Sequence, residues 1–385
     1  MEPNLDKAVD PMPTPRRRTV LAGAAALAAP LLVGGIGATP AQATPKGRRR
    51  RHGKRSVLQI AEQGVFAAGG TVQQTPGTFD PINGQMAPAG QTRHSDHASV
   101  FYQVPIRDNG HAMQFLHGYG QSRNGWMTTP DGRPGFSDLF LAKGYSVYLA
   151  DQPRRGQAGQ TSVAATIDVT PDDQTWFTQF RMGLWPNFAA GLKFPTDADS
   201  LDQFFRQMTP NTGPFDVDVI TDAMVASLEE SGPATLVTHS QGGIPGWFIA
   251  MASKNVEGVI AIEPGSFVFP EGQVPPAIET GYAPVQGSAV SAKEFRRLTR
   301  MPIAVYFGDF IPAKPSEVPA WDFWRGVLEL AYRFADVVNA HGGDATVVHL
   351  PKVGITGNEH FMFQDTNNAQ VANHMARWMR RKKLS

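Results

Sequence analysis

The chain has 385 residues, 41% of them hydrophobic, with a formal net charge of +1 and no cysteine. An α/β fold often reaches about 250 residues or more as one unit, so this length allows one large domain with a sizeable core. The lack of cysteine excludes a fold held together by disulfides, and the 39 Gly and 31 Pro indicate many loops.

Residues 1–43 resemble an export signal. Arg17 and Arg18 stand before an apolar stretch rich in Ala, Leu and Gly at 22–36, and Ala-Gln-Ala at 41–43 forms a small-residue cleavage site. The paired arginines resemble a twin-arginine signal. A membrane anchor is the alternative, but the stretch is short for a membrane span. We therefore expect twin-arginine export, removal of this segment, a secreted or extracytoplasmic mature protein and no stable membrane anchor.

A run of seven Lys and Arg lies within residues 46–55. From Ser56 onward the chain has 24 Lys and Arg against 31 Asp and Glu, so the excess of basic charge is confined to this end. We interpret residues 44–58 as a solvated, disordered linker, and a loose contact with an anionic cell surface or a nucleic acid is the alternative. No aromatic residues are interleaved with the basic ones, so we expect no nucleic-acid partner.

Strands and helices then alternate along the chain. Strands are predicted at 65–72, 98–104 and 113–116, a helix at 137–143 and a strand at 145–150. Beyond a region at about 157–215 that lacks a long periodic pattern, we predict a helix at 219–229, a strand at 234–238, a helix at 242–253, strands at 258–262 and 303–307, a helix at 321–340, a strand at 345–350 and a helix at 367–380. This order predicts one domain, residues 59–385, with a mostly parallel sheet, helices on both faces and a cap insertion at about 157–215.

Ser240 is a candidate nucleophile, because it lies between the strand predicted at 234–238 and the helix predicted at 242–253. A tight strand-to-helix turn lifts a serine hydroxyl above the sheet, at a helix N-terminus whose N–H groups favour negative charge. The sequence Thr-His-Ser-Gln-Gly resembles the G-x-S-x-G nucleophile elbow of α/β-hydrolases. Gly242 is kept, and Thr238 stands in place of the first glycine.

A predicted strand ends in Leu-His-Gly-Tyr-Gly at 116–120. This stretch resembles the oxyanion-hole loop of the same fold, in which the backbone N–H of Tyr119 would act together with that of Gln241, the residue after the nucleophile. Two such donors stabilise the negative oxygen of a tetrahedral intermediate. We interpret His117 as a structural residue that packs beneath the loop.

Ten histidines are candidates for the general base. His360 lies after the last predicted strand and before the last predicted helix, where this fold places its base. The other histidines lie in the tail, beside strands, in the oxyanion loop, in the elbow or within the terminal helix. We therefore expect His360 to take the proton from Ser240 and to return it to the leaving group.

Two carboxylates are candidates for the acid that orients the histidine. Glu263 follows the strand predicted at 258–262, and Asp309 follows the strand predicted at 303–307, where most α/β-hydrolases carry their acid. Either carboxylate could accept the imidazole N–H and fix its tautomer. The residues by themselves leave both possibilities open.

Several stretches together resemble a bacterial secreted esterase subgroup whose triad is Ser–Glu–His, with the Glu on the earlier strand. The most specific stretches are Glu-Pro-Gly at 263–265 and Gln-Asp-Thr-Asn-Asn at 364–368, and the resemblance extends over about residues 64–378. It implies an α/β-hydrolase fold, ester hydrolysis without a metal or other cofactor, and the glutamate as the triad acid, with Asp309 as the alternative acid. Tyr119 and Gly120 depart from the subgroup's oxyanion loop.

The function predicted from these features is that of a secreted serine hydrolase, which cleaves small-molecule carboxylic esters through an acyl-enzyme. The alternatives are a lactonase, an amidase or a hydrolase of a polymer or natural product with the same triad, or a non-catalytic binding protein of the same fold. The aromatic residues of the insertion either line an acyl or alcohol pocket or form the insertion's own core. They are Trp176, Phe177, Phe180, Trp185, Phe194, Phe204 and Phe205.

Overall fold

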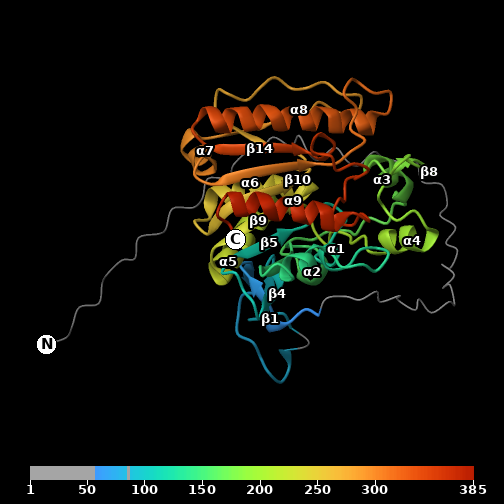
Figure 1. The fold of residues 1–385 in the computed structure, drawn as a ribbon. Coiled ribbons are helices and arrows are strands. Elements are labelled where there is room, and N and C mark those ends of the chain that lie inside the picture. Colours follow the sequence, from blue (N-terminus) through green and yellow to red (C-terminus); the bar gives the residue numbers. More distant parts are fainter. Residues whose placement is uncertain (1–56, 85–86) are drawn as a thin grey trace.

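The computed structural model describes residues 57–84 and 87–385 (Figure 1). The predicted signal at 1–43 and most of the predicted linker at 44–58 lie outside the described residues. None of the described helices is both long and apolar enough to cross a bilayer.

Within the described ranges, the largest sheet has eight strands in the order β1-β4-β6-β5-β9-β10-β13-β14. They are β1 (Ile60–Ala68), β4 (Ala98–Pro105), β5 (Ala112–Leu116), β6 (Ser146–Asp151), β9 (Ala234–His239), β10 (Val256–Ile262), β13 (Pro302–Phe307) and β14 (Asp344–His349). Strand β4 runs antiparallel to both of its neighbours, and the strands from β6 to β14 are parallel to one another. The sheet is therefore mostly parallel, as the sequence predicts.

Short strand pairs lie outside this sheet. They are β2 (Thr71–Gln74) with β3 (Thr92–Ser95), β7 (Gly183–Leu184) with β8 (Asn187–Phe188), and β11 (Val268–Pro270) with β12 (Ser288–Val290). The prediction of a single strand at 65–72 was wrong. Gly69 and Gly70 take φ values of +65° and +96°, which turn the chain out of the extended conformation and separate β1 from β2.

The described helices are α1 (Asn124–Met127), α2 (Phe136–Leu141), α3 (Asp173–Gln179), α4 (Ala198–Arg206), α5 (Val217–Ser231), α6 (Gly243–Ala252), α7 (Ala292–Leu298), α8 (Pro319–Ala340) and α9 (Asn368–Arg381). Short 3-10 helices lie at Gly156–Ala158, Ser240–Gly242 and Leu350–Val353. The sequence predicts α2, α5, α6, α8 and α9 to within a few residues. Helices α1, α3, α4 and α7 were not predicted, because they are too short to show a helical period over a window of about 11–18 residues.

The sheet separates two hydrophobic cores. Successive residues of a strand point to opposite faces, and β10 shows this alternation clearly. Val259 and Ala261 belong to the core beneath α5, α6, α7 and α8, whereas Ile260 and Ile262 belong to the core beneath α2 and α9. Because both faces are covered, the central strands β5, β9 and β10 are buried at nearly every position.

The segment between β6 and α5 contains α3, β7, β8 and α4, and it lies within the region predicted as a cap. Figure 1 shows α3, β8 and α4 grouped beyond one end of the sheet. Backbone hydrogen bonds join this segment to the loop that follows β14: the His360 N–H donates to the Phe180 carbonyl at 3.2 Å, and the Lys193 N–H donates to the Gly357 carbonyl at 2.7 Å. The segment is therefore held at the end of the sheet where the parallel strands terminate.

Candidate active site

Ser240 lies at a sharp turn between β9 and α6. Its φ is +52°, in the left-handed region that residues other than glycine rarely adopt. Such strain persists only where surrounding contacts hold it, and it is concentrated at functional sites. Packing around the turn is close, since a Cβ on Gly242 would lie 2.3 Å from the His117 carbonyl oxygen. The glycine that follows the serine in the elbow pattern is thus a steric requirement here.

Thr238 replaces the first glycine of the elbow pattern, and Gly246 on α6 makes room for it. A Cβ on Gly246 would lie 2.7 Å from Thr238 Cγ2. Carbon atoms in ordinary contact are about 3.5–4.0 Å apart, so only glycine lets the helix approach the strand this closely. The space that the pattern usually obtains from a glycine in the strand comes here from a glycine in the helix.

Ser240, His360 and Glu263 form one chain of hydrogen bonds. The Ser240 hydroxyl donates to His360 Nε2 with an O–N distance of 2.9 Å, and His360 Nδ1 donates to Glu263 Oε2 at 2.5 Å. This chain requires the tautomer with its proton on Nδ1, which leaves Nε2 free to accept. The histidine and the glutamate are buried, while the serine lines a pocket. The structure therefore brings together three residues that the sequence singles out.

The Glu263 carboxylate is completely buried, and both of its oxygens are hydrogen-bonded. Oε1 accepts from Arg181 Nη2 at 2.5 Å and from the Gly308 N–H at 2.7 Å. Burial raises the pKa of this carboxyl, but the charge of Arg181 and the hydrogen bond from His360 outweigh burial and lower the pKa to about 2. Glu263 is therefore ionised at neutral pH.

The His360 ring packs against four rings, those of Phe180, His239, Trp324 and Phe361. Phe180 stacks nearly parallel to it with ring centroids 5.3 Å apart, and the Trp324 ring lies 4.5 Å away. Burial lowers the pKa of His360, and the hydrogen bond to Glu263 opposes that effect. His239 donates from Nε2 to the His360 carbonyl at 3.0 Å. These contacts fix the orientation of the imidazole and favour its neutral form.

The alternative acid, Asp309, has a different set of partners. Its carboxylate accepts from the backbone N–H groups of Gly357 and Phe310, both at 2.8 Å. Its backbone carbonyl accepts from Arg181 Nε at 3.1 Å. In the described structure the His360 Nδ1 hydrogen bond goes to the glutamate, and Asp309 instead holds the turn that precedes the histidine.

The predicted oxyanion loop lies directly against the serine. A Cβ on Gly118 would lie 2.7 Å from Ser240 Cβ. The Gly118 carbonyl accepts from Arg155 Nη1 at 2.6 Å and from His117 Nδ1 at 3.1 Å. His117 Nε2 accepts from the Gln152 N–H at 3.3 Å, and burial lowers the pKa of His117 to about 4. His117 is thus a neutral residue with structural contacts, in agreement with the interpretation from the sequence.

Arg155 is the second anchor of this loop, and it is completely buried. Its Nε donates to Asn211 Oδ1 at 2.8 Å, its guanidinium lies 5.8 Å from the centre of the Tyr119 ring, and burial lowers its pKa to about 10. Because a peptide group is planar, fixing the Gly118 carbonyl also fixes the direction of the Tyr119 N–H. The Gln241 N–H lies in the first turn of a helix, where backbone N–H groups have no intrahelical acceptor.

A pocket of about 830 Å³, counting the space at its open mouth, leads to the serine. Its aromatic lining residues are Tyr119, Trp176, Phe180, Tyr282, Phe323 and Trp324. No Asp, Glu, Lys or Arg is among the described lining residues, and His360 is the histidine among them. The described part of the chain also contains no cluster of three or more His, Asp and Glu side chains suited to hold a metal ion.

Some aromatic residues of the 157–215 segment line the pocket, and others are buried in a core. Trp176 and Phe180 line the pocket. Phe177, Phe194 and Phe204 are buried in the core on the α9 side of the sheet, Phe205 is partly buried against that core, and Trp185 is exposed. The segment therefore supplies part of the pocket wall, and its other buried aromatic residues join the core that lies between the sheet and α9.

Reasoning from the sequence missed two buried arginines, Arg155 and Arg181. A signal for Arg181 was present, because this arginine stands among apolar residues in Phe-Arg-Met-Gly-Leu at 180–184. Charged side chains are almost never fully buried without a partner, so an arginine inside an apolar stretch indicates a buried acid nearby. Arg155 lies in Pro-Arg-Arg-Gly at 153–156, a polar loop sequence that carries no such signal.

Comparison with known proteins identifies the family. The protein "Probable secreted lipase phiG" from Fungal sp. (strain ATCC 74256) is 29% identical over 302 residues, which cover 69% of this chain and 81% of the fungal protein. A solved structure described as "The Atomic Resolution Structure of a Novel Bacterial Esterase" is 26% identical and has a TM-score of 0.68, with 85% of this chain and 98% of that chain covered. The sequence profile described as "Alpha/beta hydrolase family" matches residues 115–384. The fold predicted from the sequence is confirmed, and the chain belongs to the alpha/beta hydrolase family.

Proposed function

We propose that this protein is a serine hydrolase that cleaves carboxylic esters through an acyl-enzyme intermediate. The observation that carries the proposal is the chain of hydrogen bonds from the Ser240 hydroxyl through the His360 ring to Glu263, at 2.9 Å and 2.5 Å. A serine bonded to a base that is in turn oriented by a third group is the arrangement that activates a hydroxyl nucleophile. The similarity to proteins named as a lipase and an esterase supports the same conclusion.

The reaction would proceed in two halves. His360 takes the Ser240 proton through Nε2 as the serine oxygen attacks the ester carbonyl, and Glu263 stabilises the imidazolium that forms. The N–H groups of Tyr119 and Gln241 donate to the developing oxyanion. The imidazolium then gives its proton to the departing alcohol, and the acyl group stays on the serine. A water molecule, deprotonated by the same histidine, releases the acid and restores the enzyme.

The pocket supports an uncharged substrate. Its wall is largely aromatic, and its polar side chains, such as Gln179 and Ser266, are neutral. A charged substrate group would lose its hydration there without gaining an opposite charge, and burying an unpaired charge is costly. Esters with neutral acyl and alcohol groups, rather than charged ones, are therefore the proposed substrate class.

Turnover of neutral p-nitrophenyl esters of graded acyl length tests the proposal. Wild type should hydrolyse them, and Ser240→Ala should retain no more than the roughly 10³–10⁴-fold acceleration over water that remains when a triad member is lost. Ser231→Ala is the matched control, because Ser231 precedes β9 and Ser240 follows it, which places the two serines at opposite ends of the strand. Near-normal turnover by Ser240→Ala would contradict the proposal.

We also propose that the protein is exported by the twin-arginine route and is released by cleavage after Ala43. The support is the sequence of residues 1–43, together with the word "secreted" in the name of the fungal relative. Protein collected from outside the cytoplasm should begin at Thr44 when its N-terminus is sequenced. An N-terminus at Met1 in that fraction would contradict signal cleavage.

A further inference from the structure

Arg181 brings a positive charge from the segment 157–215 directly to the proposed triad acid. It follows α3 in the chain, takes a φ of +64° and has a completely buried side chain. Its Nη2 lies 2.5 Å from Glu263 Oε1, and its Nε donates to the Asp309 carbonyl at 3.1 Å. Its guanidinium carbon lies 5.2 Å from the centre of the Trp324 ring. The first contact joins the guanidinium to the carboxylate that holds the histidine, and the other two hold the guanidinium in place.

The two oxygens of Glu263 are divided between a cationic partner, Arg181, and a neutral one, the His360 imidazole. Oε1 is taken by Arg181, together with the Gly308 N–H, and Oε2 is taken by His360. We propose that Arg181 is a positioning residue of the triad, which keeps the buried Glu263 charged while weakening its attraction for a protonated His360, so that the enzyme stays active at lower pH. This inference rests on the proposed function, because it assumes that His360 must be neutral to accept the serine proton.

Arg181, Glu263 and His360 are all buried, so their charges act on one another with little screening by water. At rest, the Glu263 carboxylate faces the Arg181 guanidinium and the neutral His360 imidazole, so these three side chains together have no net charge. Protonating His360 would add a second positive charge beside Arg181, and like charges at close range disfavour the protonated form. A guanidinium keeps its charge in proteins, so its effect does not change with pH. Without Arg181, the Glu263–His360 pair would take up a proton at a higher pH.

Other titratable groups surround the pair, but they differ from Arg181 in charge or in contact. Burial lowers the pKa of His239 and of His349, which favours the neutral form of both rings. Burial raises the pKa of Glu359 and raises that of Asp365 to about 8, so both carboxyls remain protonated in acid. The Asp309 carboxylate accepts from the backbone N–H of Phe310, which is next to it in the chain, and from that of Gly357 in the loop after β14. Arg181 is the charged group in direct contact with the glutamate.

The test is the rate at which a fluorophosphonate inactivates the enzyme, measured from about pH 4 to 9. Labelling needs a neutral His360, so the rate falls in acid as the histidine is protonated. We call the fall of the labelling rate at low pH the acid limb, and its midpoint is the pH at which the rate is half of its maximum. Arg181→Gln keeps a hydrogen-bond donor but removes the charge, so the midpoint of its acid limb should rise by about one pH unit. Arg181→Lys keeps the charge, and its acid limb should stay close to that of wild type.

Arg154→Gln controls for the loss of a buried arginine, because Arg154 pairs with Asp96 at 2.9 Å and not with the triad. Its acid limb should not move. An unchanged acid limb in folded Arg181→Gln, or the same shift in Arg181→Lys, would overturn the inference. If Arg181→Gln does not fold, the pH profile of wild type is the test. A midpoint of its acid limb at or above the ordinary imidazole pKa of about 6.5 would contradict the inference. Wild type that is not labelled at any pH would instead contradict the proposed function.

Discussion

Glu263 and Asp309 both follow parallel strands, and the difference between them lies in what their carboxylates bind. Glu263 accepts from His360 and Arg181 through its side chain, whereas Asp309 accepts from backbone N–H groups at Gly357 and Phe310. The longer glutamate side chain reaches the imidazole from β10, the strand before the one that carries Asp309. The two carboxylates thus have separate tasks, one at the histidine and one at the turn that leads to it.

Replacing each acid by its amide should separate these tasks. Glu263→Gln removes the counter-charge of the imidazolium and permits the wrong tautomer of His360, so kcat should fall by up to about 10⁴-fold. Asp309→Asn keeps an oxygen that can accept from a backbone N–H, so its kcat should fall much less. The measurement is kcat for both variants on the same neutral ester, after circular dichroism shows that both are folded. A larger loss in the aspartate variant would make Asp309 the triad acid.

The sequence predicts those catalytic residues that stand at a fixed place in the order of strands and helices. Ser240 follows a strand and precedes a helix, and His360 follows the last strand, so both could be named without knowing any tertiary contact. Arg155 and Arg181 could not be placed in this way. Each binds residues far away in the chain: Arg155 contacts Gly118 and Asn211, and Arg181 contacts Glu263. The contact with Asn211 and the position of Arg181 depend on how the 157–215 segment folds over the sheet. That segment has no period long enough to predict its path.

At the scale of single elements, the contact between β9 and α6 decides how the serine is presented. Gly246→Ala adds a methyl group that would lie 2.7 Å from Thr238 Cγ2, too close for the strand and helix to stay where they are. Overpacking of this kind costs about 1–3 kcal/mol, which outweighs the roughly 1 kcal/mol by which alanine favours a helix over glycine. The variant should therefore have a lower free energy of unfolding than wild type.

A second substitution should reverse the effect. Thr238→Ala removes the Cγ2 atom that the new methyl group would meet, so the double variant Thr238→Ala/Gly246→Ala should be more stable than the two single changes predict. Contacting residues show coupling energies of about 0.5–3 kcal/mol. Urea unfolding of wild type, both single variants and the double variant measures this coupling. Strict additivity would show that the helix and the strand do not meet as described.

Element prediction succeeded where a pattern was long and failed where it was short. The 22 residues of α8 show a clear helical period and were predicted to within two residues of the start. Helix α7 has seven residues and was missed, although its first turn carries a signal: Ser291 and Glu294 form a capping box in which each side chain bonds the other residue's backbone. A search for capping boxes as well as for periodicity would have found it.

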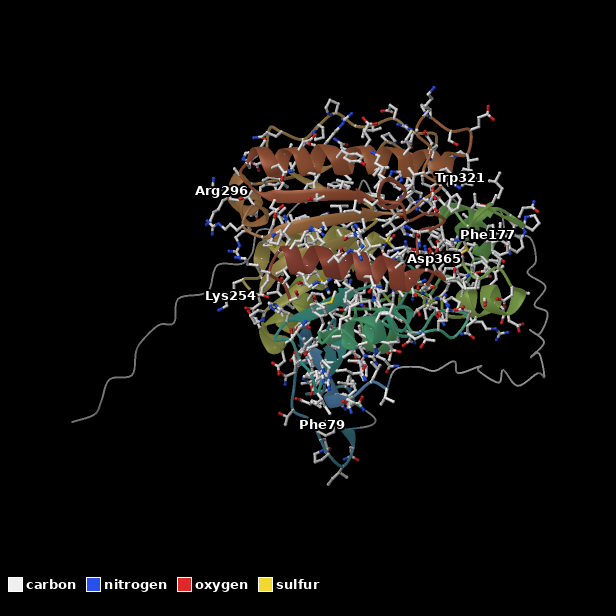
Figure 2. All side chains as sticks on the ribbon, viewed as in Figure 1. Phe79, Phe177, Lys254, Arg296, Trp321 and Asp365 are labelled. Atoms are coloured by element: carbon white, nitrogen blue, oxygen red, sulfur yellow. The ribbon has the colours of Figure 1, made fainter. Side chains whose placement is uncertain are left out.

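At the scale of the whole molecule, the proposed active site lies at one end of the sheet. Figure 2 shows Phe177 and Trp321 close together at one end, while Lys254 and Arg296 lie at the opposite end. The contact at the first end is a hydrogen bond from Trp321 Nε1 to the Thr178 carbonyl at 3.1 Å, which joins α8 to α3. Helices from distant parts of the chain thus meet at the end of the sheet where the pocket opens.

The order of strands in the sheet could not be derived from the sequence. Strand β5 lies between β6 and β9, although it precedes both in the chain. The sequence indicates that strands and helices alternate, which predicts a mostly parallel sheet. Which strands become neighbours depends instead on the crossovers that connect them, and these are pairings between residues far apart in sequence.

The most direct test of the central claim is to find where a fluorophosphonate binds covalently on the intact, folded protein. Peptide mapping by mass spectrometry after labelling should show one modified residue, Ser240, and Ser240→Ala should carry no adduct. The reason is that, among the serines at 57–84 and 87–385, Ser240 is the one that donates its proton to a histidine held by a buried carboxylate. An adduct on a different residue, or a folded wild-type protein that stays unlabelled, would contradict the account.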